Sequence, residues 1–195
     1  PILVSFLVKL AIDGIAIENA AELLPRIEPT ADQLGAIQQE LRRTDYRRGL
    51  ERAMFGERAI TILTLDDPST IDGSISNASL YVPFTQSAKA TYLDLTDDSI
   101  EALHDTWHEL TVPERFDSDW KPRRWNPGDI IAALIVPAFE PCFQAGARQT
   151  AKANCLDVAI AAELFRREHG SFPQQIEELV PEFLSAVPVA PFDGR

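Results

Sequence analysis

The sequence is poor in cysteine, and its glycines are not clustered. Its two cysteines, Cys142 and Cys155, are too few for a disulfide framework or a structural zinc site. On one helix they would lie roughly 20 Å apart, too far to form a disulfide with each other. The nine glycines are scattered along the chain, which argues against a glycine-rich loop that binds phosphate. We expect both cysteines to be small core residues.

Basic charge is also scarce. The 18 lysines and arginines are outnumbered by 30 acidic residues, and the net charge of -12 opposes diffuse binding to nucleic acid or anionic lipid. One local exception surrounds two tryptophans, and it consists of Trp120, Lys121, Arg123, Arg124 and Trp125. We interpret it as a solvated linker in which arginine packs on tryptophan, and we expect no nucleic-acid partner.

No apolar run is long enough to cross a bilayer. In the opening "PILVSFLVKLAIDGIAIENAAELL", Lys9 and Asp13 interrupt the run before about 20 apolar residues accumulate, so we expect a core helix there. We interpret the chain, from Pro1 to Arg195, as a piece of a longer protein. Membrane contact is then expected only through a segment that this chain lacks.

Residues 1–66 contain several signals that begin or end a helix. Pro25 ends the first predicted helix, Thr30 begins a capping box for the second, and Thr44 or Asp45 caps the third. Apolar residues recur at helical spacing in these segments. We therefore predict an N-terminal three-helix lobe over residues 1–66.

The middle of the chain alternates between turn formers and helical periodicity. Turn formers predict a loop over residues 67–82, and periodicity then predicts a central helix pair over residues 83–111, restarted at Thr96. Prolines and tryptophans over residues 112–128 predict a linker.

The last predicted segment, residues 129–195, holds a long helix with expected bends at Pro137 and Pro141. Gly170 closes this helix, and Pro173 begins a short second one. No strand pattern or internal repeat is found. The sequence thus predicts an all-α fold, a multi-helix bundle-like body with a C-terminal helical hairpin and an extended proline-rich tail.

The motif "HDTWHE" places two histidines four residues apart. On a helix His104 and His108 share a face, as zinc ligands of metalloproteases do, and Glu109 is a candidate third ligand. Asp105, however, replaces the glutamate that would activate a water. Both histidines fall at the edge of an apolar stripe, so we favour half-buried surface residues and expect no metal.

A second candidate is Glu57 in "FGERA", on the same helix face as Leu50, Ala53 and Ile60. A carboxylate on an apolar face is costly unless it is paired. The candidate arginine partners are Arg43, Arg47 and Arg58. We favour an interior ion pair over the alternative, a general acid or base with a raised pKa, and assign no catalytic residue.

The segment "ALIVPAFEPCFQAGARQTAKANCLDVAIAAELFRREHGSFP" resembles the helix, glycine and aromatic-proline sequence of type IV pilin-like proteins, including the major pseudopilin of type II secretion. The matching residues are Ile135 to Ala138, Cys155-Leu156, His169 to Pro173 and the ending Pro188 to Gly194. The chain is also similar to uncharacterised bacterial envelope families with a "Gly-Glu-Arg-Ala" motif, here Gly56 to Ala59.

This resemblance implies a non-enzymatic interaction or scaffold protein of the bacterial cell envelope, extracytoplasmic or membrane-anchored. Its partners would be other envelope or secretion proteins, no cofactor is expected, and an apolar surface groove or patch is predicted. The alternative is a metal-dependent or carboxylate-based hydrolase that uses His104 and His108, or Glu57.

Three phenylalanines in the C-terminal segment are the expected interaction residues: Phe172, Phe183 and Phe192. We expect Phe172 to pack back on Leu164 or Phe165 beside the helix cap. We expect Val187, Val189 and Phe192, in the proline-rich tail, to lie across the helices.

Overall fold

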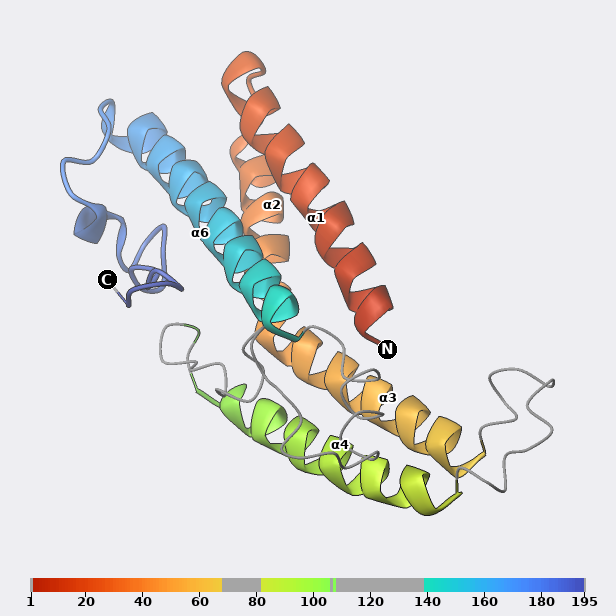
Figure 1. The fold of residues 1–195 in the computed structure, drawn as a ribbon. Coiled ribbons are helices and arrows are strands. Elements are labelled where there is room, and N and C mark those ends of the chain that lie inside the picture. Colours follow the sequence, from red (N-terminus) through yellow and green to blue (C-terminus); the bar gives the residue numbers. More distant parts are fainter. Residues whose placement is uncertain (1, 68–81, 106, 108–138, 195) are drawn as a thin grey trace. The chain divides into compact units, whose positions relative to one another are not determined.

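The computed structural model describes residues 2–67, 82–105, 107 and 139–194 (Figure 1). Within these ranges the fold is all-α and contains no strand, so the predicted fold class is confirmed. The chain divides into two compact units. Unit 1 comprises Pro1–Leu7 and Arg47–Gln144, and unit 2 comprises Val8–Tyr46 and Ala145–Arg195.

The first helices begin and end where local signals predict. Helix α1 spans Leu3–Leu23, and the 3-10 helix η1, Leu24–Arg26, follows it and contains Pro25. Helix α2 spans Ala31–Arg43. Its capping box is complete, because Gln33 N donates to Thr30 Oγ1 at 3.2 Å and Thr30 N donates to Gln33 Oε1 at 2.9 Å.

Helix α6 spans Phe139–His169 and forms much of unit 2. Pro141 is the third residue of the described helix, and the turn that precedes it lies outside the described residues, so the expected bend there stays a prediction. Pro137 lies outside the described residues. The helix ends as predicted at Gly170, whose φ of 79° is left-handed and whose N–H donates to Arg166 O at 2.9 Å.

In unit 2, α1 and α6 run in the same direction and α2 lies beside them (Figure 1). Gly14 lies against Gln149, and farther along both helices Glu18 pairs with Lys152. A Cβ atom on Gly14 would lie only 3.2 Å from Gln149 Oε1, so the absence of a side chain permits this close approach.

The C-terminal segment is less regular than predicted. Instead of a helix from Pro173, the structure has the 3-10 helix η5 at Ile176–Leu179. Glu178 Oε1 accepts the backbone N–H groups of Gln174 and Gln175, both at 3.0 Å, and so favours a start after Gln175.

The hydrophobic contacts of this segment come from residues other than those predicted. Leu179 and Leu184 are buried with Ala161 of α6 in one cluster. The tail side chains expected to cross the helices are instead exposed, namely Val187, Val189 and Phe192.

In unit 1, α3 (Tyr46–Asp66) and α4 (Val82–Ala102) are antiparallel neighbours (Figure 1). Two ion pairs join these helices, Arg58 with Asp97 and Asp66 with Lys89. The later residue of α3 pairs with the earlier residue of α4, as antiparallel helices require. Their buried side chains include Leu50, Ala53, Met54, Ala88, Tyr92 and Leu95.

Helix α4 does not restart at Thr96 as expected. Thr96 lies within one continuous helix, and its hydroxyl donates to the carbonyl of Tyr92 at 2.9 Å. Ser99 makes the same type of bond to Leu95 O at 3.0 Å. A threonine or serine hydroxyl that donates to a carbonyl one turn earlier has its hydrogen bond within the helix, so these residues can lie in the middle of it.

Candidate functional site

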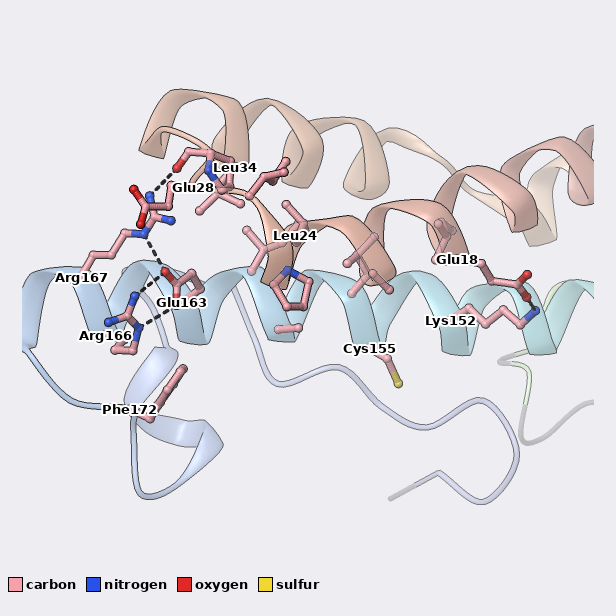
Figure 2. A pocket seen from close by; sticks show the side chains of 18 of the residues that line it. Glu18, Leu24, Glu28, Leu34, Lys152, Cys155, Glu163, Arg166, Arg167 and Phe172 are labelled. Atoms are coloured by element: carbon pink, nitrogen blue, oxygen red, sulfur yellow. Dashed lines mark hydrogen bonds and ion pairs between the residues drawn. The ribbon is translucent and has the colours of Figure 1, made fainter.

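Unit 2 contains a groove of about 1110 Å³ between the C-terminal half of α1, with the residues that follow it, and α6 (Figure 2). Most of the lining is apolar and includes Ile17, Ala21, Leu24, Leu156, Ala159 and Ile160. Alanines leave space where larger side chains would fill it. The proline of η1 ends α1 and turns the chain along the rim toward α2.

Polar bonds cross the groove at both ends (Figure 2). At one end, Lys152 of α6 pairs with Glu18 of α1. At the other end, Arg167 of α6 donates to the carbonyl of Pro29, which precedes α2. These two bonds connect the walls and define the length of the groove.

A cluster of three charges lies at the Arg167 end. Glu163 accepts hydrogen bonds from Arg166 at 2.7 and 2.8 Å and from Arg167 at 2.8 Å. These hydrogen bonds hold the pKa of Glu163 at about 2, well below its usual range. The guanidinium of Arg166 lies 5.6 Å from the ring centroid of Phe172, which also lines the groove.

The two cysteines have different environments. Cys142 is buried, and burial raises the pKa of its thiol. Cys155 is exposed and lines the groove, so the expectation that it is a core residue is wrong. Both cysteines are free, and both lie on α6, as the spacing argument assumed.

Glu57 has a different role from the predicted ion pair. Its Oε2 accepts the backbone N–H of Leu3 at 3.2 Å, where a carboxylate favours the N-terminus of α1. The candidate arginines are bound elsewhere in the described structure: Arg58 to Asp97, Arg47 to the carbonyls of His104 and Asp105, and Arg43 to Glu40. Ile60 is exposed, so the apolar face does not extend to it.

The predicted histidine pair is not brought together on a described helix. Helix α4 ends at Ala102, and His104 lies beyond it in a turn, with its N–H donating to Glu101 O at 2.9 Å. The His104 side chain is 69% exposed and lies 3.6 Å from Glu51. His108 lies outside the described residues, and within those residues no three potential ligands form a metal-binding group.

The three expected interaction phenylalanines are in different environments. Phe172 is 57% exposed at the groove, and Phe192 is 60% exposed in the tail. Phe183 is structural, since it packs against the buried cluster and meets the Phe165 ring edge-on at 5.7 Å. The His169 ring stacks on the Phe165 ring, with 4.1 Å between their centroids. The described ring contacts of Phe165 are therefore with His169 and Phe183, whereas a contact with Phe172 was expected.

A polar cluster of unit 2 was not among the features predicted from the sequence. The buried Asp157 of α6 accepts Gln38 Nε2 at 2.7 Å and two Arg42 N–H groups at 2.9 and 3.0 Å. Arg42 also donates to Phe183 O at 2.7 Å, so one arginine connects α2, α6 and the C-terminal segment. An aspartate in the apolar stripe of α6, next to Leu156, was the available signal.

A second polar cluster connects α1 and α6 near Tyr46. Burial raises the pKa of Tyr46 to about 12; Asp13 adds to this rise and Gln149 opposes part of it. Lys9 pairs with Asp13 and lies 5.7 Å from the Tyr46 ring centroid. The phenol therefore stays protonated and acts as a packing and hydrogen-bonding group.

No described helix has both the length and the apolar character needed to cross a membrane. Comparison with known proteins finds no family model, curated protein or solved structure that matches this chain.

Proposed function

We propose that this chain is a non-enzymatic binding protein of the bacterial cell envelope and that the groove of unit 2 is its binding site. The observation that carries the proposal is the groove itself, about 1110 Å³ in volume and largely apolar in its lining. Concave, mostly apolar sites with a few fixed polar groups are typical of binding sites.

The polar groups of the groove favour binding over catalysis. Lys152 is paired with Glu18, and Glu163 is held ionised between Arg166 and Arg167. A carboxylate with a pKa of about 2 is a poor general base near neutral pH, because it has little affinity for a proton. Lys152 therefore joins the two walls, and Glu163 serves to position the two arginines of its own helix.

The hydrolase alternative has less support. Neither Glu57 nor His104 lines the groove. Glu57 binds the N–H of Leu3, and the His104 side chain projects into solvent beside Glu51. Neither residue is therefore placed to act on a molecule held in the groove.

The assignment to the envelope rests on the resemblance to pilin-like proteins. The resembling segment includes α6, one wall of the groove. Tagged full-length protein should be tested for protease access in whole cells and spheroplasts. We expect cleavage from outside the cytoplasmic membrane, and a soluble, protected cytoplasmic signal would contradict the assignment.

The binding role can be tested by photocrosslinking in cells. A photoreactive amino acid at Ala159, in the groove, should give a discrete adduct, whereas the same amino acid at Gln39, an exposed α2 position outside the groove, should not. Ala21→Trp, on the opposite wall, should remove the adduct by filling the space. Equal labelling at both positions, or none at Ala159, would count against binding in the groove.

A further inference from the structure

The groove of unit 2 also indicates the chemistry of its occupant. We propose that it holds an uncharged, elongated apolar small molecule with a single hydrocarbon chain. This inference rests on the proposed binding role of the groove and deepens it. Four features carry the argument: the volume, the lining, the bridged ends and the balance of charge.

The volume and lining fit a small molecule. The groove has a volume of about 1110 Å³, slightly above the roughly 300–1,000 Å³ usual for small-molecule sites. Aliphatic side chains of both walls, such as Leu24 and Ile160, line its length. A hydrocarbon chain would gain free energy by leaving water for this surface.

The bridged ends limit the length of the occupant. Lys152 and Arg167 make the two bonds that cross the groove, and both lie on α6. At about 1.5 Å per residue they are roughly 22 Å apart. A partner helix that continues beyond about 15 residues, roughly 22 Å, would have to pass over these bonds, whereas a single hydrocarbon chain of that length or less can lie between them.

The charges of the groove balance each other. Three acidic and three basic side chains line it: Glu18, Glu28, Glu163, Lys152, Arg166 and Arg167. All but Glu28 are joined in ion pairs within the groove. A charged head group would have to break an existing pair or add an unbalanced charge, so the geometry favours an uncharged one.

The test is equilibrium binding of an uncharged fluorescent probe, N-phenyl-1-naphthylamine, to the purified full chain. Competitors with the same chain length would be 1-hexadecanol, palmitate and hexadecyltrimethylammonium, each below its aggregation concentration. We expect saturable probe binding and displacement by hexadecanol at concentrations at least about tenfold lower than by either ion, a difference of about 1.4 kcal/mol.

Two groove-filling variants assign the binding to this site. Ala159→Trp and Ala21→Phe start from exposed alanines on opposite walls, so the fold should tolerate them. Each should weaken probe binding at least about tenfold, whereas Gln39→Trp, outside the groove, should leave it unchanged. Circular dichroism would check the helix content of all three variants, and the second groove variant serves if the first does not fold.

Three results would overturn the inference: no saturable probe binding, equal or better competition by an ion, or equal probe affinity in the groove and control variants. Failure here is separable from failure of the proposed function. A protein adduct at Ala159 without probe binding would retain the binding role and reject the small molecule. Probe binding with a cytoplasmic location would retain the ligand class and reject the envelope.

Discussion

The two units are stabilised in different ways. In unit 1, the described α3 and α4 bury apolar side chains against each other and place the ion pair of Arg58 with Asp97 at the surface. In unit 2, the buried carboxylate of Asp157 in α6 accepts hydrogen bonds from Gln38 and Arg42 of α2, and Arg42 also donates to Phe183 O of the C-terminal segment. Apolar packing is non-directional, whereas hydrogen bonds to one carboxylate fix the positions of their donors.

This difference bears on how unit 2 keeps its groove open. Directional bonds at Asp157, and the bridges made by Lys152 and Arg167, hold segments in place without filling the space between them. Apolar elements held only by packing tend to move together, because voids in a core are costly. We infer that the polar ties of unit 2 help to keep its groove open.

The largest expected effect tests the apolar interior of unit 1. Leu50 of α3 is fully buried, so Leu50→Ala should lower the free energy of unfolding by about 2–5 kcal/mol through lost burial and a cavity. Urea unfolding measures the loss, and hydrogen exchange should place it in α3 and α4. The matched control Leu63→Ala, on the exposed face of the same helix, should cost less than about 0.5 kcal/mol. Similar losses for both variants would contradict the predicted difference between the two faces.

The next effect tests the polar tie of unit 2. Asp157→Ala leaves Gln38 and Arg42 without their partner and should cost about 2–3 kcal/mol, less than for a fully buried pair, since the Arg42 side chain is 41% exposed. Hydrogen exchange should show lost protection in α2 and around Phe183. Glu168→Ala, at an exposed position of α6, is the control. An Asp157→Ala protein as stable as this control would refute the role of the tie.

The sequence predicted features whose causes are local. The capping box at Thr30 and the left-handed turn at Gly170 depend on residues within four positions of one another, so spacing alone identified them. The Asp157 tie depends on Gln38, 119 positions away, and no local pattern encodes that meeting. An apolar groove or patch was expected, but its location was not predicted, because its walls come from segments that are far apart in the sequence.

One failed expectation concerns the continuity of a helix. The helix restart at Thr96 was inferred from residue type, but the effect of a threonine depends on its position within a helix. The hydroxyl of Thr96 finds an acceptor in its own helix. This position is not visible before the helix boundaries are known.

A smaller effect concerns the pH dependence of unit 2. The pKa of Glu163 is lowered to about 2, so its stabilising contribution is complete above its ordinary value of 4.5 and is lost as the pH falls toward 2. Because Glu163 and its arginine partners are partly solvent-exposed and therefore screened, we expect a loss of only about 1 kcal/mol. Urea unfolding of the wild type and Glu163→Gln at pH 7, 4 and 2.5 measures it. The stability difference between the two proteins should shrink with acid, and a constant difference would contradict the assignment.

The smallest effect compares one substitution in the two units. In unit 1, the hydroxyl of Tyr92 is buried without a hydrogen-bond partner among the described residues, and burial raises its pKa. Tyr92→Phe removes an unsatisfied group, so it should change the free energy of unfolding by less than about 1 kcal/mol, toward greater stability. In unit 2, Asp13 and Gln149 lie near the phenol of Tyr46 and shift its pKa, so Tyr46→Phe should remove a favourable polar contact and destabilise by about 1 kcal/mol.

Opposite signs in these two variants, measured by urea unfolding, would support the contrast between an apolar unit 1 and a polar-tied unit 2. Tyr92→Phe is the more informative variant, because burial of a hydroxyl costs free energy only while the hydroxyl lacks a hydrogen-bond partner. A loss above about 1 kcal/mol in Tyr92→Phe would mean that this hydroxyl has a hydrogen-bond partner, and Thr61, which opposes part of the rise in the Tyr92 pKa, is the described candidate. The interior of unit 1 would then be tied by directional bonds as well, and polar ties would no longer distinguish the two units.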